Sequence, residues 1–149
     1  MALVGAEELF RAADVLAVNC PLNEETRGFV SAGRIGLMKP TAYLINTARG
    51  PIVDEGALAA ALAEGRLAGA GLDVFDPEPP AAGAAILRAP NVVAAPHALS
   101  WTDQGFAAIR AACVSAVQAA RRGEAPAHLA NPEVLRAAPR LLRNPDRTP

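Results

Sequence analysis

The sequence predicts an α/β fold built on a parallel sheet. Four short runs rich in Val, Leu, Ile and Ala alternate with segments whose apolar residues recur at helical spacing. Such alternation is typical of βαβ units, in which right-handed crossovers join parallel strands. The strands are expected near residues 14–19, 42–46, 69–74 and 92–95, and the longest helix at about 101–122.

The first half of the chain supplies two of these strands. Residues 7–13 have helical spacing, and Asp14 then leads into an apolar run that stops at Pro21, because proline cannot continue a hydrogen-bonded ladder. Ser31 is expected to cap a short helix that ends near Met38, just before a Lys-Pro pair. The second strand follows and ends in the sequence Asn-Thr-Ala-Arg-Gly-Pro.

Helix boundaries are marked more clearly in the second half. Asp54 is a good N-cap for a helix with apolar residues four positions apart, and Gly65 supplies a left-handed stop. The segment 100–103 resembles a capping box ahead of the longest helix, which ends at Gly123. A further short helix is expected around residues 133–136.

Composition indicates one ordinary globular domain and a tail. The chain has 149 residues, 52% of them hydrophobic, and its net charge of −1 argues against binding to nucleic acid or to an anionic membrane surface. No segment has the ~20 apolar residues of a membrane span, and no signal-like run is present, so we expect a cytoplasmic protein. Residues 1–123 should form the domain, last helix included, and residues 124–149 a loosely ordered Pro- and Arg-rich tail.

Two features that could suggest a cofactor or metal site do not support one. Gly69 and Gly71 look like the start of a dinucleotide fingerprint, but the third glycine is missing and the segment enters a strand instead of leaving one. We expect these glycines to allow close packing of strand and helix. Cys20 and Cys113 match no metal or redox spacing, so free thiols and no bound metal are expected.

Polar residues follow the strands where the apolar runs end. Arg49 follows the second strand, Asp73 and Glu78 follow the third, and His97 follows the fourth. In an open parallel sheet, ligands bind in the crevice outside the carboxyl ends of the strands. We therefore expect Arg49, Glu78 and His97 to converge there, with Glu78 within hydrogen-bond reach of His97. Taken alone, an arginine at a strand end favours a surface ion pair, and the other polar residues at strand ends shift the interpretation toward a site.

Six short segments, in this order, resemble the D-isomer-specific 2-hydroxyacid dehydrogenase family. They are Asn19-Cys20-Pro21-Leu22, Met38-Lys39-Pro40, Asn46-Thr47-Ala48-Arg49-Gly50, Gly71-Leu72-Asp73-Val74-Phe75, Glu78-Pro79 and Pro96-His97. The resemblance runs from Glu7 to about Leu135 and implies an incomplete Rossmann-like sheet, the second half of an NAD(P)-binding domain. A truncated member is expected, without the glycine-rich turn that holds the pyrophosphate and without most of the substrate domain.

The resemblance implies an oxidoreductase that transfers a hydride between NAD or NADP and a small 2-hydroxy or 2-keto acid. His97 would be the general acid/base, Glu78 would fix its tautomer, and Arg49 would hold the substrate carboxylate. The implied cofactor contacts are Cys20, Pro21, Thr26, Thr47, Ala48, Arg49, Asp73 and His97. Alone, the chain is expected to be inactive.

Structural alternatives stay open for several of these residues. Cys20 is equally compatible with a small buried thiol, and Thr26 with a residue that stabilises its own loop. Asp73 could be a strand-end acceptor, but its place in the Gly-Leu-Asp-Val-Phe motif favours the site. For the whole chain the alternative is a non-catalytic α/β module that associates with itself or a partner through an exposed sheet edge, since residues 14–18 would leave one edge unpaired. A homo-oligomer, or pairing with a separate N-terminal half, is expected in either case.

Overall fold

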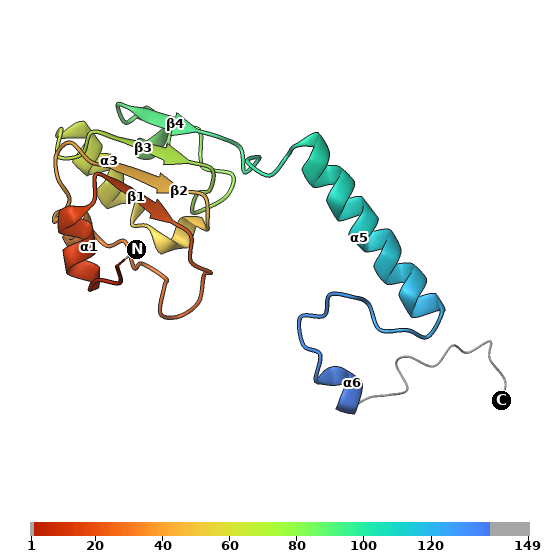
Figure 1. Ribbon diagram of the computed structural model, residues 1–149. Coiled ribbons are helices and arrows are strands. Elements are labelled where there is room, and N and C mark those ends of the chain that lie inside the picture. Colours follow the sequence, from red (N-terminus) through yellow and green to blue (C-terminus); the bar gives the residue numbers. More distant parts are fainter. Residues whose placement is uncertain (1, 138–149) are drawn as a thin grey trace. The chain divides into compact units, whose positions relative to one another are not determined.

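Four parallel strands form one sheet in the order β1-β2-β3-β4 (Figure 1). The computed structural model describes residues 2–137. The strands are β1 (Val15–Val18), β2 (Tyr43–Asn46), β3 (Gly69–Leu72) and β4 (Val92–Ala94). The helices are α1 (Ala6–Ala12), α2 (Ala32–Ile35), the 3-10 helix η1 (Gly50–Ile52), α3 (Glu55–Ala63), α4 (Ala85–Arg88), α5 (Asp103–Arg121) and α6 (Val134–Ala137). The predicted α/β class is confirmed, and all four predicted strands belong to this sheet.

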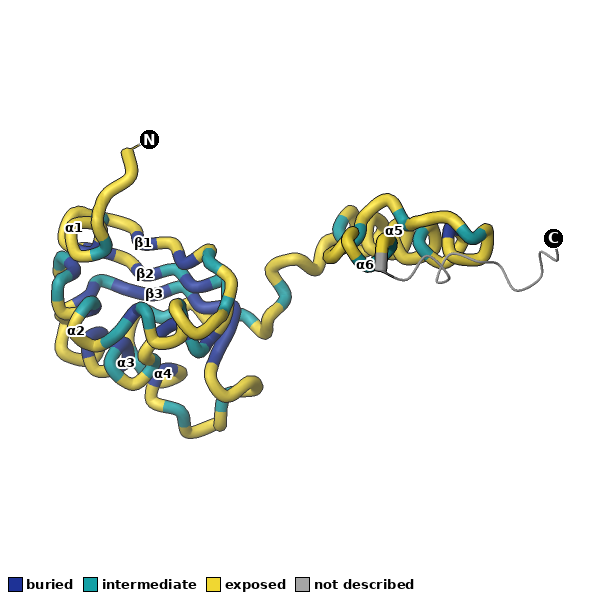
Figure 2. Tube along the Cα trace, turned by 90° about the horizontal axis from the view of Figure 1, so that it is seen from below, coloured by how far each residue is buried: buried dark blue, intermediate teal, exposed yellow. Residues whose placement is uncertain are grey.

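The helices between the strands lie on one side of the sheet. Each connection moves to the next strand in the same direction, and right-handed crossovers then place every connecting helix on the same face. Figure 2 shows α2, α3 and α4 together on one side of the strands. A complete doubly wound sheet carries helices on both faces. In this unit the connecting helices α2, α3 and α4 cover one face.

Burial alternates along the strands accordingly. Leu16, Leu44 and Ala70 are paired in register across three strands, and all three are buried under the helices. Val15 and Tyr43, which directly precede Leu16 and Leu44, point to the opposite face of the sheet and are exposed. Each fully buried Leu contributes roughly 1.5–3 kcal/mol relative to an exposed one. The core therefore lies between the sheet and its single helical layer.

The boundaries of two predicted helices need correction. Ser31 caps α2 as expected, accepting a hydrogen bond from the Arg34 amide at 3.4 Å, but α2 ends at Ile35. The amide of Met38 bonds to the carbonyl of Ile35, a tighter turn that does not continue the α-helix. Thr102, and not Ser100, caps α5, since Oγ1 of Thr102 accepts a hydrogen bond from the Gly105 amide at 2.9 Å.

The predicted residues at both ends of α3 are confirmed. Asp54 caps α3 by accepting a hydrogen bond from the Ala57 amide at 2.9 Å. Gly65 adopts a φ of 68° just after this helix, in the left-handed region that glycine tolerates best. Helices α4 and η1 were not predicted, because each is a single short turn without apolar periodicity.

Gly69 and Gly71 are required by packing inside the sheet. A Cβ atom on Gly69 would lie 2.9 Å from the carbonyl oxygen of Asn91, and one on Gly71 would lie 3.0 Å from Cδ1 of Ile45. Both glycines belong to β3 and contact side chains or backbone of neighbouring strands. The expected close packing is present, but its partners are strands and not a helix.

The described residues divide into two compact units at Leu99–Ser100, whereas the expected boundary lay after residue 123. The second unit contains α5, a 19-residue helix, and α6, which occurs where a short helix was predicted. Within α5, Ala119 is buried and the larger apolar side chains are exposed. The predicted loose tail extends into residues 138–149, which lie outside the described residues. No helix in the described part of the chain is long and apolar enough to cross a membrane.

Candidate functional site

His97 and Glu78 lie in contact beyond the carboxyl ends of β4 and β3. Nδ1 of His97 is 3.1 Å from Oε2 of Glu78, with 47% and 37% of the two side chains exposed. Because a carboxylate only accepts hydrogen bonds, this contact places the proton on Nδ1 and leaves Nε2 open toward the surroundings. The predicted contact between these two side chains is confirmed.

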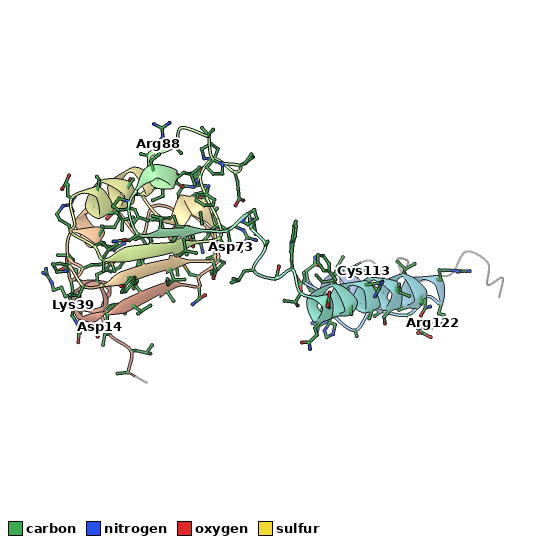
Figure 3. The ribbon with its side chains drawn as sticks, turned by 90° about the horizontal axis from the view of Figure 1, so that it is seen from above. Asp14, Lys39, Asp73, Arg88, Cys113 and Arg122 are labelled. Carbon is green, nitrogen blue, oxygen red and sulfur yellow. The ribbon has the colours of Figure 1, made fainter. Side chains whose placement is uncertain are left out.

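The backbone around His97 is held by Asp73. Asp73 is 5% exposed, and its Oδ1 and Oδ2 accept hydrogen bonds from the amides of Ala98 and Leu99 at 2.9 and 3.1 Å. Figure 3 shows Asp73 at the end of the sheet where the chain leaves β4. His97 has a φ of 53°, a left-handed conformation that costs a residue with a Cβ about 1–2 kcal/mol. Asp73 thus acts as a strand-end acceptor that stabilises this conformation, and its cofactor contact stays a prediction.

Asn46 shapes the loop that carries Arg49. Its Nδ2 donates to the Arg49 carbonyl at 3.0 Å, and its Oδ1 accepts from the Ala48 amide at 3.1 Å. The side chain is buried at the end of β2. Sequence reasoning did not assign Asn46 a role, although an Asn at the end of an apolar run is typical of a turn stabilised by its own side chain.

The Arg49 loop also packs against the segment that leads to Glu78. A Cβ atom on Gly50 would overlap the carbonyl group of Phe75, so only glycine allows this approach. The Arg49 side chain is exposed and donates to the Ala48 carbonyl at 2.6 Å. Among the described residues it forms no hydrogen bond or ion pair with Glu78 or His97. Its convergence with that pair stays a prediction.

A cavity of about 540 Å³ opens beside the His97–Glu78 pair. Its lining is formed by residues that follow β3, by the last residue of β4 and those after it, and by one residue of α4: Phe75, Glu78, Pro79, Pro80, Leu87, Ala94, Ala95, Pro96 and His97. Mostly apolar walls with a few convergent polar groups are typical of small-molecule sites, and this volume falls in their usual range. A small ligand bound in this cavity would therefore lie next to His97.

Three of the residues predicted to contact the cofactor, Cys20, Pro21 and Thr26, have structural roles around the loop after β1. Oγ1 of Thr26 donates to the Pro21 carbonyl at 2.7 Å and accepts from the Asn23 amide at 2.9 Å. Cys20 is a half-buried free thiol that packs against the core. The alternative of a loop-stabilising Thr26 is thus supported, and cofactor binding by Cys20, Pro21 and Thr26 stays a prediction. Cofactor binding by Thr47 and Ala48, two half-buried residues that follow β2, also stays a prediction.

Glu55 connects α3 to the segment before Glu78. Its Oε2 accepts a hydrogen bond from the Asp76 amide at 3.3 Å. Burial raises the pKa of the Glu55 carboxyl, and the nearby charge of Asp76 raises it further, while the hydrogen bond from the Asp76 amide partly opposes both.

The sequence profile described as D-isomer specific 2-hydroxyacid dehydrogenase, NAD binding domain, matches residues 1–98. The chain belongs to this family. Glyoxylate reductase from Thermofilum pendens is 40% identical over 139 residues, which are 93% of this chain and 41% of that protein. The chain thus spans about 41% of the length of this curated relative.

Solved structures agree with this assignment. The D-isomer specific 2-hydroxyacid dehydrogenase from Lactobacillus delbrueckii ssp. bulgaricus, in its NAD-complexed form, matches with a TM-score of 0.75 and 31% identity over 83% of this chain and 42% of that one. The corresponding enzyme from Xanthobacter autotrophicus, in complex with NADPH, matches with a TM-score of 0.59 and 41% identity over 62% of this chain and 29% of that one. The predicted family and its nicotinamide cofactor are confirmed.

Proposed function

We propose that this chain supplies the acid/base and substrate-binding residues of an NAD(P)-dependent oxidoreductase acting on a small 2-hydroxy or 2-keto acid. The observation that carries the proposal is the contact between His97 and Glu78 beside an apolar cavity. Family membership and the similarity to a glyoxylate reductase support the same substrate class. Alone, the chain is proposed to be inactive, because its sequence holds no glycine-rich turn for the pyrophosphate.

The residues at the carboxyl ends of the strands fit the nicotinamide end of the cofactor. Thr47 and Ala48 lie on a loop whose backbone is held by Asn46, which keeps it in place beside the sheet. Asp73 is buried with both oxygens bonded to amides, and each oxygen keeps a second lone pair for a carboxamide N–H. When bound, the cofactor supplies or accepts the hydride at C2 of the substrate.

His97 moves the proton that accompanies the hydride. In the reduction, Nε2 of the imidazolium donates its proton to the carbonyl oxygen, which becomes the hydroxyl of the product. The neutral imidazole that remains keeps its proton on Nδ1, where it is hydrogen-bonded to Glu78. In the reverse reaction, Nε2 accepts the proton from the substrate hydroxyl. Arg49 binds the substrate carboxylate through its guanidinium fork after leaving the Ala48 carbonyl, where it now donates.

A chimera tests these roles. Residues 7–135 would be joined to the N-terminal half of an active glyoxylate reductase, and the reduction of glyoxylate with NADH or NADPH would be followed. His97→Asn is the preferred variant, because Asn tolerates the left-handed backbone at this position. We expect it to lower kcat on the order of 10²–10⁴-fold. His128→Asn, at an exposed histidine of the second unit, is the matched control and should retain full activity.

Two further variants separate proton transfer from substrate binding. Glu78→Gln should lower kcat, because the neutral amide stabilises the imidazolium less well than a carboxylate. Arg49→Ala should raise KM for the keto acid, because it removes the guanidinium that would bind the substrate carboxylate. Full activity in His97→Asn would show that His97 is not the proton donor.

The second candidate is a non-catalytic module that pairs through its sheet edge, and the open side of β1 favours it. Val15 is exposed on this edge strand. A chain of this kind would bind the separately expressed N-terminal half of a relative without giving an active enzyme. Val15→Lys should then abolish binding, and Leu9→Lys, at an exposed position of α1, should not. Keto-acid reduction by the reconstituted pair would exclude the non-catalytic reading.

A further inference from the structure

Residues 76–80, here called the Glu78 segment, are held to the first unit by few hydrogen bonds. Three of these five residues are prolines, which have no backbone N–H to donate. Among the described residues, the only backbone amide of the segment that donates a hydrogen bond is that of Asp76, and its acceptor is Oε2 of Glu55 at 3.3 Å. The position of the Glu78 segment therefore depends on this one backbone anchor.

Glu55 reaches the Asp76 amide from a firmly held part of the chain. It is the first residue of α3, and the side chain of Asp54 caps this helix. Ile52 and Val53, just before the cap, are buried in the core. Because the start of the helix and the chain that leads to it are both fixed, the Glu55 side chain holds the amide in a defined place.

The peptide group between Phe75 and Asp76 is also contacted by Gly50. A Cβ atom on this glycine would overlap the carbonyl group and lie 2.8 Å from the nitrogen, so the two backbones pack directly against each other. Gly50 follows Arg49 and lies five residues before Glu55, in the same short stretch of chain. That stretch therefore contributes both the residue assigned to the substrate carboxylate and the anchor of the Glu78 segment.

We propose that Glu55 is a positioning residue for the proton transfer, because its side-chain oxygen holds the Glu78 segment where Glu78 meets Nδ1 of His97. This inference rests on the proposed function, in which His97 moves the proton. Glu78 lies two residues beyond the anchored amide, and its Oε2 is 3.1 Å from Nδ1. Without the anchor the segment moves away from the histidine, and Nδ1 loses the acceptor that fixes its proton.

A second role of Glu55 has to be separated from this one, since its charge in the first turn of α3 also favours the helix. Glu55→Gln removes the charge but keeps an acceptor of the same length. Glu55→Met has a similar size and no acceptor, and Glu55→Asp keeps the charge but is one methylene too short for the Asp76 amide. Glu64→Met, at the other end of α3, is the matched control, because Glu64 forms an exposed ion pair with Arg66 that contributes little.

The ring nitrogens of His97 report the position of Glu78 in the full chain. We would record their ¹⁵N chemical shifts at about pH 8, where an ordinary imidazole is neutral and the shifts show which nitrogen carries the proton. Glu78→Ala gives the signals of a ring without its acceptor. Glu55→Met and Glu55→Asp should move the His97 signals at least halfway toward those of Glu78→Ala, whereas Glu55→Gln and Glu64→Met should leave them in place. His128 is the internal reference, and its signals should not move in any variant.

Hydrogen exchange of the Asp76 amide shows whether the anchor itself is lost. Exchange should be about tenfold faster in Glu55→Met and Glu55→Asp, and within about threefold of the unsubstituted chain in Glu55→Gln. Where circular dichroism shows that Glu55→Met unfolds, Glu55→Asp decides. Unchanged His97 signals in these variants would overturn the proposal, because Glu55 would then stabilise only its own loop. Equal changes in Glu55→Met and Glu55→Gln would also overturn it, because the acceptor would not be the cause.

The chimera with an active glyoxylate reductase separates this inference from the proposed function. Glu55→Met should lower kcat about three- to tenfold and leave KM within about twofold, because Asn46 and Gly50 still hold the Arg49 loop. Glu55→Gln should restore kcat. An unchanged kcat in Glu55→Met beside an inactive His97→Asn would overturn the role of Glu55 alone. Full activity in His97→Asn would overturn both, because no proton transfer by His97 would remain for Glu55 to support.

Discussion

Replacing Asp73 with Asn is expected to release the segment that carries His97. The carboxylate accepts hydrogen bonds from two consecutive amides, those of Ala98 and Leu99, at 2.9 and 3.1 Å. An Asn side chain of the same shape has only one acceptor oxygen, so its NH₂ group must face the second amide N–H. One hydrogen bond is lost, and the other loses its charged acceptor.

The size of the effect follows from the burial of Asp73. A hydrogen bond to a charged group contributes about 1.5–3 kcal/mol, and a neutral one about 0.5–1.5 kcal/mol. Losing the first and weakening the second should cost about 2–4 kcal/mol, because Asp73 is 5% exposed and water cannot replace the lost partner. His97 also has a φ of 53° that this anchoring stabilises, so the cost should fall on the local segment before it affects the whole unit.

Native-state hydrogen exchange of the Ala98 and Leu99 amides measures this loss. In Asp73→Asn both should exchange roughly 30- to 1,000-fold faster, which corresponds to the same 2–4 kcal/mol. Asp76→Asn is the control, because Asp76 is exposed and its side chain accepts no hydrogen bond among the described residues. If Asp73→Asn exchanges like Asp76→Asn, the anchoring of the His97 segment by Asp73 is refuted.

Three further changes have definite expected outcomes. Gly50→Ala should destabilise the first unit by about 3 kcal/mol or more in urea unfolding, because its Cβ atom would overlap the Phe75 carbonyl. Asp54→Ala should cost about 1 kcal/mol in the same assay through the lost cap of α3. Glu55→Gln tests pH dependence. Because the pKa of Glu55 is raised in the folded state, its contribution to stability is present below the ordinary carboxyl pKa. That contribution is lost as the pH rises through the folded-state pKa. The unfolding free energy of the unsubstituted chain relative to Glu55→Gln should therefore fall as the pH rises from the ordinary carboxyl pKa through the raised folded-state pKa.

The parts of the fold that depend on nearest neighbours in sequence could be predicted. The apolar run that became β2 has polar residues at its end and a proline soon after, and Asp54 and Gly65 bracket α3 with residues that terminate helices for local reasons. The start of α5 was misplaced because Ser100 and Thr102 are both good caps by residue type. Only the backbone path, which turns into the helix at Asp103, distinguishes them.

The contacts that hold the candidate site together could not be predicted, because the residues that make them are distant in sequence. Asp73 binds amides 25 and 26 residues later, and this contact exists only after β3 and β4 have paired. The approach of Gly50 to Phe75 likewise depends on two loops at the same end of the sheet. The sequence placed Glu78 and His97 at this end through the rule for strand ends, but it could not show which backbone groups keep them there.

These contacts distinguish two parts of the candidate site. The His97–Glu78 contact is formed by the first unit itself, and the Arg49 side chain has no partner in that contact. Asp73 holds the backbone after His97, and Gly50 allows the segment before Glu78 to pack closely, so the His97–Glu78 contact rests on interactions within the first unit. Arg49 differs, because its loop backbone is anchored by Asn46 while its exposed guanidinium donates only to the adjacent Ala48 carbonyl among the described residues. A neutral carbonyl is a weaker acceptor for a guanidinium than a carboxylate. If the proposed function is correct, a 2-keto acid would therefore draw Arg49 away from Ala48, whereas the His97–Glu78 contact is already formed within the first unit.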